Sequence, residues 1–123
     1  MIVGTEWLIE AFGCDRERLR DQAVLRSVFC IVIADLDLKV TDEIWHTFPG
    51  EGGVTGIAAL TESHLACHTY PEHGVATFNL YCCRSRPEWD WANELKATLA
   101  AADVTITKIE RGREYMMSAG GRQ

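Results

Sequence analysis

The sequence contains no long hydrophobic run. Its longest apolar stretch, residues 28–34, is far shorter than the roughly 20 residues that a membrane-spanning helix needs. No Lys or Arg precedes Arg16, so the positively charged start of a secretory leader is also missing. We therefore expect a cytoplasmic protein that has no membrane partner.

The sequence is also poor in basic charge and in paired cysteine motifs. Twelve Lys and Arg side chains stand against 18 Asp and Glu, the formal net charge is -6, and the basic residues form no dense run. A nucleic-acid partner is therefore not expected. The five cysteines are odd in number and none has C-x-x-C spacing, so we expect free thiols.

The remaining composition is that of an ordinary folded protein. Hydrophobic residues make up 47% of the chain and charged residues 24%, which disfavours disorder. A chain of 123 residues suits one domain, residues 1–123, with a single core. The tail that holds Met116 and Met117 is expected to fray.

Apolar patterns predict six strands and two helices. The predicted strands are residues 2–11, 38–48, 54–61, 63–70, 75–83 and 104–110. One helix is predicted from Arg16 onward, capped by Asp15, with an apolar stripe of Leu25, Val28, Phe29 and Val32. The other is predicted to start near Pro87 and carries Ala92, Leu95, Leu99 and Ala102.

This order of elements predicts an α+β fold. We expect a two-layer sandwich, in which two helices lie on one face of a mostly antiparallel sheet. The other face then lacks cover, so two copies are expected to stack sheet to sheet as a homodimer.

Alternation along two strands predicts which side chains share a face. In strand 63–70, one face carries His64, Ala66 and His68, and the other carries Leu65, Cys67 and Thr69. In strand 75–83 the alternation turns Cys83 away from the apolar layer and makes Cys82 a small core residue.

The densest chemistry lies in residues 61–74, T-E-S-H-L-A-C-H-T-Y-P-E-H-G. From the residues alone, a polar edge strand and turn explain this cluster as well as a reactive site does. A metal site of His64, Cys67 and His68 would need a helix, because a strand separates Cys67 from both histidines. The β-branched and aromatic residues nearby favour the strand, so we predict no metal ion.

The pattern E-S-H-L-x-x-H-T-x-P-E-x-G within this segment resembles the processing-site signature of the prokaryotic S-adenosylmethionine decarboxylase family. The signature is long and specific, and the resemblance covers nearly the whole chain. Further matching positions are Gly4, Cys14, His46-Thr47-Phe48, Gly53-Val54-Thr55-Gly56, Cys83 and Glu110-Arg111-Gly112.

The resemblance implies a self-processing, pyruvoyl-dependent carboxy-lyase. The proenzyme would cut itself between Glu62 and Ser63, giving a β chain of residues 1–62 and an α chain of residues 63–123. Ser63 would become the pyruvoyl cofactor, which forms a Schiff base with the substrate amine and accepts the electron pair released with carbon dioxide. His68 would be the processing base, and Cys83 would donate the proton to the substrate carbon. That role favours a thiol partly shielded from water.

The resemblance also implies which residues bind the substrate. Phe48 lies near the family's adenine-stacking aromatic residue, Glu72 matches a substrate-binding position, and Thr55 replaces a serine that assists processing. Glu6 stands where the family has a histidine, and Tyr70 precedes Pro71-Glu72 where the family has tryptophan. A further departure is Arg84, which replaces the glycine after the proton-donating cysteine.

These departures leave the substrate open. We expect S-adenosylmethionine decarboxylation for spermidine biosynthesis, with L-arginine or L-ornithine as the alternative substrate and Glu6 as the candidate partner of its cationic side chain. Both readings belong to polyamine biosynthesis. A third reading, an inactive paralogue that regulates an active partner, is disfavoured by the intact Ser63, His68 and Cys83.

Overall fold

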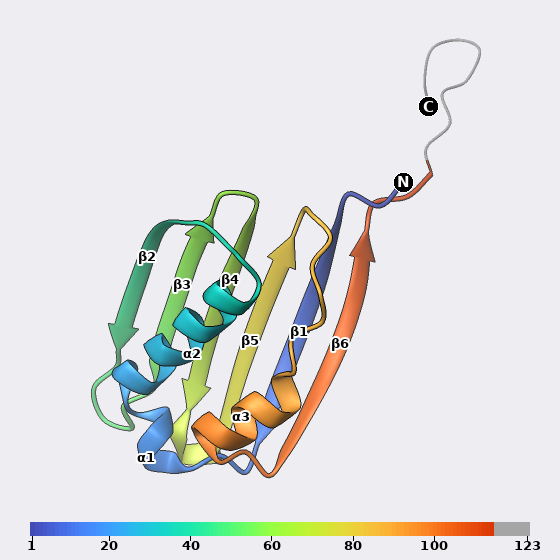
Figure 1. Ribbon diagram of the computed structural model, residues 1–123. Helices are drawn as coiled ribbons and strands as arrows, with labels where there is room; N and C mark the ends of the chain where they lie inside the picture. The colour runs from blue at the N-terminus through green and yellow to red at the C-terminus, as the bar shows by residue number, and fades with distance from the viewer. Residues whose placement is uncertain (115–123) are drawn as a thin grey trace, which may run out of the picture.

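The computed structural model describes residues 1–114, and the predicted frayed tail at Met116 and Met117 lies outside them. The strands form one six-stranded sheet, and Figure 1 shows that the helices lie on one side of it. The sheet order is β2-β3-β4-β5-β1-β6, and every neighbouring pair is antiparallel. The elements are β1 (Gly4–Phe12), α1 (Arg16–Leu19), α2 (Gln22–Asp35), β2 (Val40–Thr47), β3 (Val54–Leu60), β4 (Ser63–Tyr70), η1 (Pro71–His73), β5 (Val75–Cys82), α3 (Trp91–Leu99) and β6 (Asp103–Arg111). The predicted α+β class and antiparallel sheet are confirmed.

The first predicted helix is two helices. Asp15 caps α1 as expected, but α1 ends at Leu19. A second N-cap, Asp21, accepts a hydrogen bond from the backbone N–H of Ala23 and starts α2. The predicted apolar stripe is confirmed, because all four of its side chains are buried: Leu25, Val28, Phe29 and Val32.

The second predicted helix, α3, begins later than Pro87 and ends before Ala102. It starts after the N-cap Asp90 and not near Pro87, because Trp89 is buried and its indole N–H donates to Asp35, which holds the preceding segment outside the helix. The helix ends at Ala100 in the left-handed conformation, so Ala102 is exposed and not part of the stripe.

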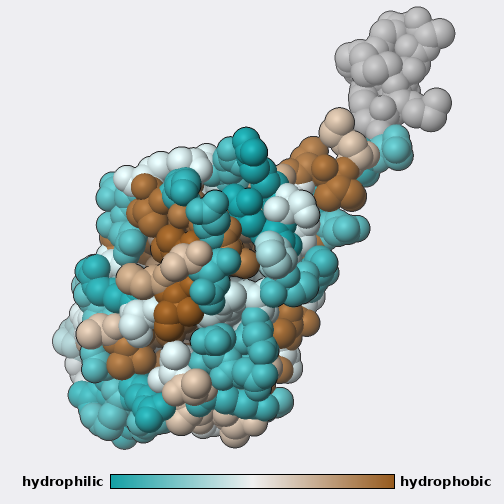
Figure 2. All heavy atoms as spheres, viewed as in Figure 1, coloured by the Kyte–Doolittle hydropathy of each residue, from teal (hydrophilic) through white to brown (hydrophobic). Residues whose placement is uncertain are grey.

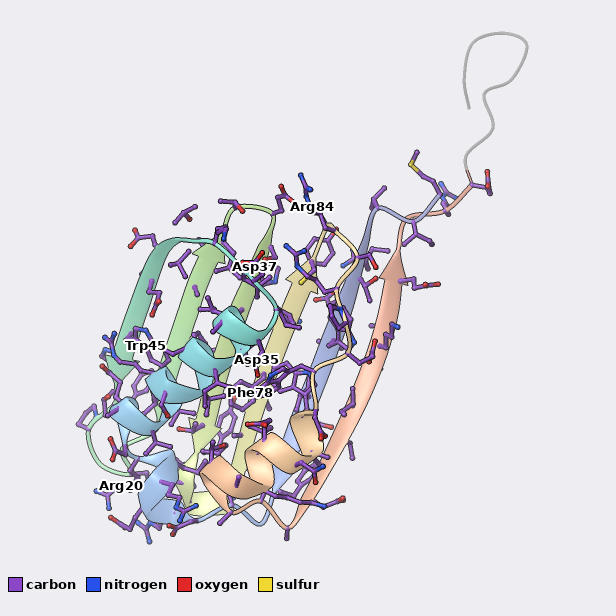
Figure 3. The ribbon with its side chains drawn as sticks, in the orientation of Figure 1. Arg20, Asp35, Asp37, Trp45, Phe78 and Arg84 are labelled. Atoms are coloured by element: carbon purple, nitrogen blue, oxygen red, sulfur yellow. The ribbon has the colours of Figure 1, made fainter. Side chains whose placement is uncertain are left out.

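The core lies between the helices and one face of the sheet. α2 and α3 cover this face, and Phe78 lies beneath them with its ring 5.7 Å from that of Trp91 (Figure 3). The predicted alternation is confirmed, because Leu65, Cys67 and Thr69 are buried. Figure 2, viewed from the helix side, shows hydrophilic side chains with apolar patches between them. No helix among residues 1–114 is long and apolar enough to cross a membrane.

The opposite, open face of the sheet carries three rows of paired side chains. The Tyr81 row consists of Ile109, Glu6, Tyr81, His64 and Ala59. The Asn79 row consists of Thr107, Leu8, Asn79, Ala66, Ile57 and Ile44. The His68 row consists of Thr105, Glu10, Thr77, His68, Thr55 and His46. None of the described helices covers these rows, so this face is where the candidate site must be sought.

Candidate functional site

The sequence-predicted site residues other than Glu6, which lies on β1 opposite Tyr81, form two groups at opposite ends of β4. Glu62, Ser63 and Cys83 lie at its start, and five other predicted residues lie at or near its end: Phe48, Thr55, His68, Tyr70 and Glu72. Ser63 and His68 are five residues apart in one extended strand, which corresponds to about 17 Å. A single chain therefore does not bring His68 to Ser63.

The Glu62–Ser63 bond lies where the tight turn after β3 enters β4. The carbonyl oxygen of Glu62 accepts a hydrogen bond from the backbone N–H of Cys83, with an N···O distance of 3.0 Å. Ser63 pairs in register with Cys82, whose side chain is buried on the helix side. Burial raises the pKa of the Cys82 thiol, and the Arg86 guanidinium and a hydrogen bond with Ser63 act against that rise. The Ser63 hydroxyl is thus held beside an un-ionised thiol.

Cys83 and Arg84 follow β5 directly. Cys83 is exposed in the single chain, so the expected shielding of its thiol from water is not found there. The Tyr81 hydroxyl is its hydrogen-bond neighbour. Arg84 forms an ion pair with Glu62 and lies just beyond the end of β5 (Figure 3). The charge of the Arg84 guanidinium is therefore paired with the Glu62 carboxylate, so Arg84 needs no ion pair with a Cys83 thiolate.

A chain of hydrogen bonds crosses the open face from His64 to Arg111. The Asn79 amide nitrogen donates to Glu6 at 2.7 Å, and its amide oxygen lies 2.9 Å from Nε2 of His64. Because an amide oxygen only accepts, Nε2 of His64 carries the proton in this bond. Arg111 donates to the second Glu6 oxygen at 2.8 Å. The Asn79 hydrogen bond, with Arg111, lowers the pKa of Glu6 against the opposing effect of burial, so the carboxylate is charged.

Tyr81 connects this chain to Cys83. Its ring stacks on that of His64 at a centroid distance of 5.7 Å, and its hydroxyl lies over Gly4, where a side chain would collide with it. Burial raises the pKa of the Tyr81 hydroxyl, and the neighbouring Cys83 thiol raises it further. Tyr81 thus stays protonated next to the predicted proton donor.

Towards the far end of β4, His68 pairs with Thr55 on the neighbouring strand β3. Oγ1 of Thr55 and Nδ1 of His68 are hydrogen-bonded at 3.0 Å. These two residues border a cavity of about 500 Å³ whose other lining residues include Phe48, Tyr70 and Glu72. A second hollow of about 430 Å³ lies beside His68 along the open face. Both volumes are in the range of small-molecule sites.

The buried hydroxyl of Thr69 fixes the wall of this cavity. It accepts a hydrogen bond from the backbone N–H of Val54 and donates one to the carbonyl of Leu19, both at 2.8 Å. These bonds tie the start of β3 to α1. The loop of residues 48–53 comes directly before β3, so these bonds anchor its end. The loop carries Phe48, which is half-exposed and packs edge-on against His46 at 4.4 Å.

Sequence reasoning did not assign a role to Asn79, Tyr81, Arg86 or Arg111. Alternation along β5 already placed Asn79 and Tyr81 on the polar face, so that signal was present. The partnership of Glu6 with Arg111 depends on the pairing of β1 with β6, which no local pattern reveals. Among residues 1–114, no three His, Cys, Asp or Glu side chains are grouped so that they could hold a metal ion.

Comparisons with known proteins identify the class of fold. The crystal structure of the adenosylmethionine decarboxylase from Aquifex aeolicus VF5 superposes with a TM-score of 0.79 over 95% of this chain and 97% of that chain, at 24% sequence identity. This protein therefore has the α+β fold of that enzyme, a six-stranded antiparallel sheet with few helices.

The sequence matches are closer. The family model for S-adenosylmethionine decarboxylase matches residues 5–112. The S-adenosylmethionine decarboxylase proenzyme of Moorella thermoacetica is 34% identical over 89% of this chain and 88% of its own, and that of Caldicellulosiruptor saccharolyticus is 30% identical over 89% of each. The chain belongs to the S-adenosylmethionine decarboxylase family. The family, function and enzyme class predicted from the sequence, a decarboxylase proenzyme that acts as a carboxy-lyase, are thereby confirmed.

Proposed function

We propose that this proenzyme cuts itself between Glu62 and Ser63 and then decarboxylates S-adenosylmethionine with the pyruvoyl group formed from Ser63. The observation that carries the proposal is the hydrogen bond from the Cys83 backbone to the Glu62 carbonyl, the group that Ser63 must attack. It fits because a backbone N–H on that oxygen stabilises the negative charge that attack creates. The Glu62–Ser63 peptide bond also lies between the end of β3 and the start of β4, so cutting it divides no strand.

The proposed processing base does not reach Ser63 within one chain. His68 is the proposed base, yet it lies about 17 Å along β4 from Ser63. We therefore place the working site between two copies. His68 of one copy, hydrogen-bonded to Thr55, would remove the Cα proton of Ser63 of the other copy, whose hydroxyl lies on the helix side beside Cys82. This arrangement gives the predicted homodimer a chemical reason in addition to the burial of an open face.

The open face supports such a pairing. The Asn79 row, in the middle, includes three exposed apolar side chains, Leu8, Ile44 and Ile57, which a second copy would cover. A two-fold axis along this row reverses the strand direction of the partner. The Tyr81 row of each copy then faces the His68 row of the other across sheets packed about 10 Å apart. The Cys83 thiol, exposed in one chain, becomes shielded.

Once formed, the pyruvoyl group supplies the carbonyl that takes up the electron pair released on decarboxylation. Cys83 then gives a proton to the substrate carbon, and Tyr81 holds that thiol against the sheet. In the cavity of about 500 Å³, Phe48 and Tyr70 offer aromatic faces for a purine, and Glu72 offers a carboxylate for polar substrate groups. These are the proposed substrate contacts.

The L-arginine and L-ornithine alternative depended on Glu6 as a free carboxylate. Glu6 is instead held by Asn79 and neutralised by Arg111. A cationic substrate would have to displace that guanidinium, so we propose that Glu6 organises the open face and does not bind a basic side chain.

The first test is intact mass spectrometry, followed by carbon dioxide release from S-adenosylmethionine, L-arginine and L-ornithine. Two fragments, the larger with a pyruvoyl mass, and release from S-adenosylmethionine are expected. Cys83→Ala should still be cut, because its backbone N–H remains, but should turn over slowly. A chain that stays whole on long incubation would contradict the proposal and favour a regulatory paralogue.

Coexpression tests the shared site. Ser63→Ala and His68→Ala chains should each remain whole alone. Expressed together, the His68→Ala chain should be cut, because its Ser63 meets the intact His68 of the other copy. No cutting of the mixture, in mixed dimers verified by mass, would refute the exchange of residues between copies.

A further inference from the structure

A small basic cavity lies at the start of β4. It is at the end of the sheet where the loop after α2 approaches the segment after β5. It measures about 240 Å³, and Figure 3 shows two of its lining residues, Asp37 and Arg84, near each other at this end of the sheet. Its lining residues are Asp37, Lys39, Thr61, Glu62, Arg84 and Arg86. Glu62 is the residue whose carboxyl group self-cleavage would release.

The charges in this cavity do not cancel. Lys39 pairs with Asp37 at 3.1 Å, and Arg84 pairs with the side chain of Glu62. Arg86 has no ion pair within residues 1–114, and its Nε is buried there without any hydrogen-bond partner. A buried donor of this kind is costly unless a partner arrives during function. The cavity thus holds one positive charge in excess.

Arg86 is also close to the reacting residue. Its guanidinium acts electrostatically on the Cys82 thiol, and Cys82 pairs in register with Ser63. Arg86 therefore lies near the buried Cys82 and Ser63 pair, and it lines the same cavity as Glu62.

We propose that Arg86, assisted by Arg84, binds the Glu62 main-chain carboxylate as it leaves during self-processing. The inference rests on the cleavage proposed above and adds a role for residues to which that proposal gives none. Cleavage creates one new negative charge at Glu62, which matches the unpaired positive charge beside it. A guanidinium fork fits a carboxylate with two parallel hydrogen bonds.

The role follows from the bonds that change. Attack by Oγ of Ser63 on the Glu62 carbonyl transfers the acyl group from nitrogen to oxygen and leaves an ester. A base then removes the Cα proton of Ser63, that electron pair forms the Cα=Cβ bond, and the Cβ–Oγ bond breaks with its electrons going to the Glu62 carboxylate. Dehydroalanine remains, and water converts its enamine to the keto group with loss of ammonia.

The leaving group of the elimination is thus a carboxylate. Charge develops on it only as the Cβ–Oγ bond breaks, so fixed cations beside it stabilise that transition state more than the ester. The same cations have no comparable partner in the earlier acyl transfer, where the oxyanion faces the Cys83 N–H. Loss of Arg86 should therefore slow the second step and let the ester accumulate.

The test follows processing in a cell-free translation reaction, sampled by mass spectrometry with and without hydroxylamine under denaturing conditions. Hydroxylamine splits the ester and leaves an unmodified Ser63 amino terminus, whereas completed processing leaves a pyruvoyl group. Arg86→Met should slow completed processing about tenfold or more and should show hydroxylamine-sensitive full-length chain. Arg86→Lys, which keeps the charge, should process faster than Arg86→Met.

Lys96→Met is the matched control, because it removes one charge from an exposed position on α3. It should process at the wild-type rate with no trapped ester. If the wild-type chain is cut and the Arg86→Met chain is cut equally fast, this inference is overturned and the proposed function stands. The same holds if Arg86→Met is cut more slowly but accumulates no ester. A wild-type chain that is never cut overturns both.

Discussion

Replacement of Thr69 by valine should destabilise the protein strongly without creating a cavity. The two side chains have nearly the same shape, but the hydroxyl serves two buried backbone groups, the N–H of Val54 and the carbonyl of Leu19. Each buried polar group left without a partner costs about 1–3 kcal/mol, so Thr69→Val should lose about 2–6 kcal/mol. That is a large fraction of the roughly 5–15 kcal/mol that stabilises a typical domain.

Urea unfolding of the uncut Ser63→Ala background gives a single-chain measurement of this loss. Thr41→Val is the control, because the exposed Thr41 hydroxyl donates to the carbonyl of Ala59 and water replaces that bond. It should change the free energy of unfolding by less than about 0.5 kcal/mol. A loss below about 1 kcal/mol for Thr69→Val would refute the reasoning. In the cleavable protein the same change should raise KM, because the loop that carries Phe48 loses its anchor.

Three further outcomes follow from the structure. Burial raises the pKa of the Cys67 thiol to about 12, so iodoacetamide at pH 8 should label the exposed Cys30 and leave Cys67 unmodified until the protein unfolds. Ile57→Asp, on the open face, should give monomers in light scattering without loss of helical signal; an unchanged dimer would contradict the sheet-to-sheet interface. The amide hydrogen bond and Arg111 lower the pKa of Glu6, so their stabilisation is present above about pH 4.5 and is lost as the pH falls. Arg111→Met should therefore be less stable than wild type at pH 7, and the difference should shrink towards pH 3.

The sequence predicted the strands well because a half-buried sheet imposes a strict alternation. Strand 63–70 begins and ends where predicted, and Leu65 and Cys67 lie on the buried face as expected. The helices were less predictable because their ends depend on single caps and on tertiary contacts. Asp21 starts a new helix within a continuous apolar pattern, and buried Trp89 keeps the chain near Pro87 non-helical.

The candidate site was predicted as a set of residues but not as an arrangement. Ser63 and His68 belong to one short motif, and a motif gives no hint that an extended strand places them at opposite ends of the sheet. The neutralisation of Glu6 could not be foreseen either, because its partner Arg111 is 105 residues away in the sequence. Contacts of that kind exist only once the register between β1 and β6 is set.

The strand order has a consequence for maturation. Cleavage at Glu62–Ser63 would leave β1, β2 and β3 in one fragment and β4, β5 and β6 in the other, yet β1 lies between β5 and β6. The two fragments are therefore interleaved in one sheet and separate only if three strand ladders open. Before cutting, folding is unimolecular; after cutting, recovery from unfolding would require two fragments to meet and thread together. Unfolding of the mature, cut protein would thus be effectively irreversible, and its activity would last only as long as the first folded state does.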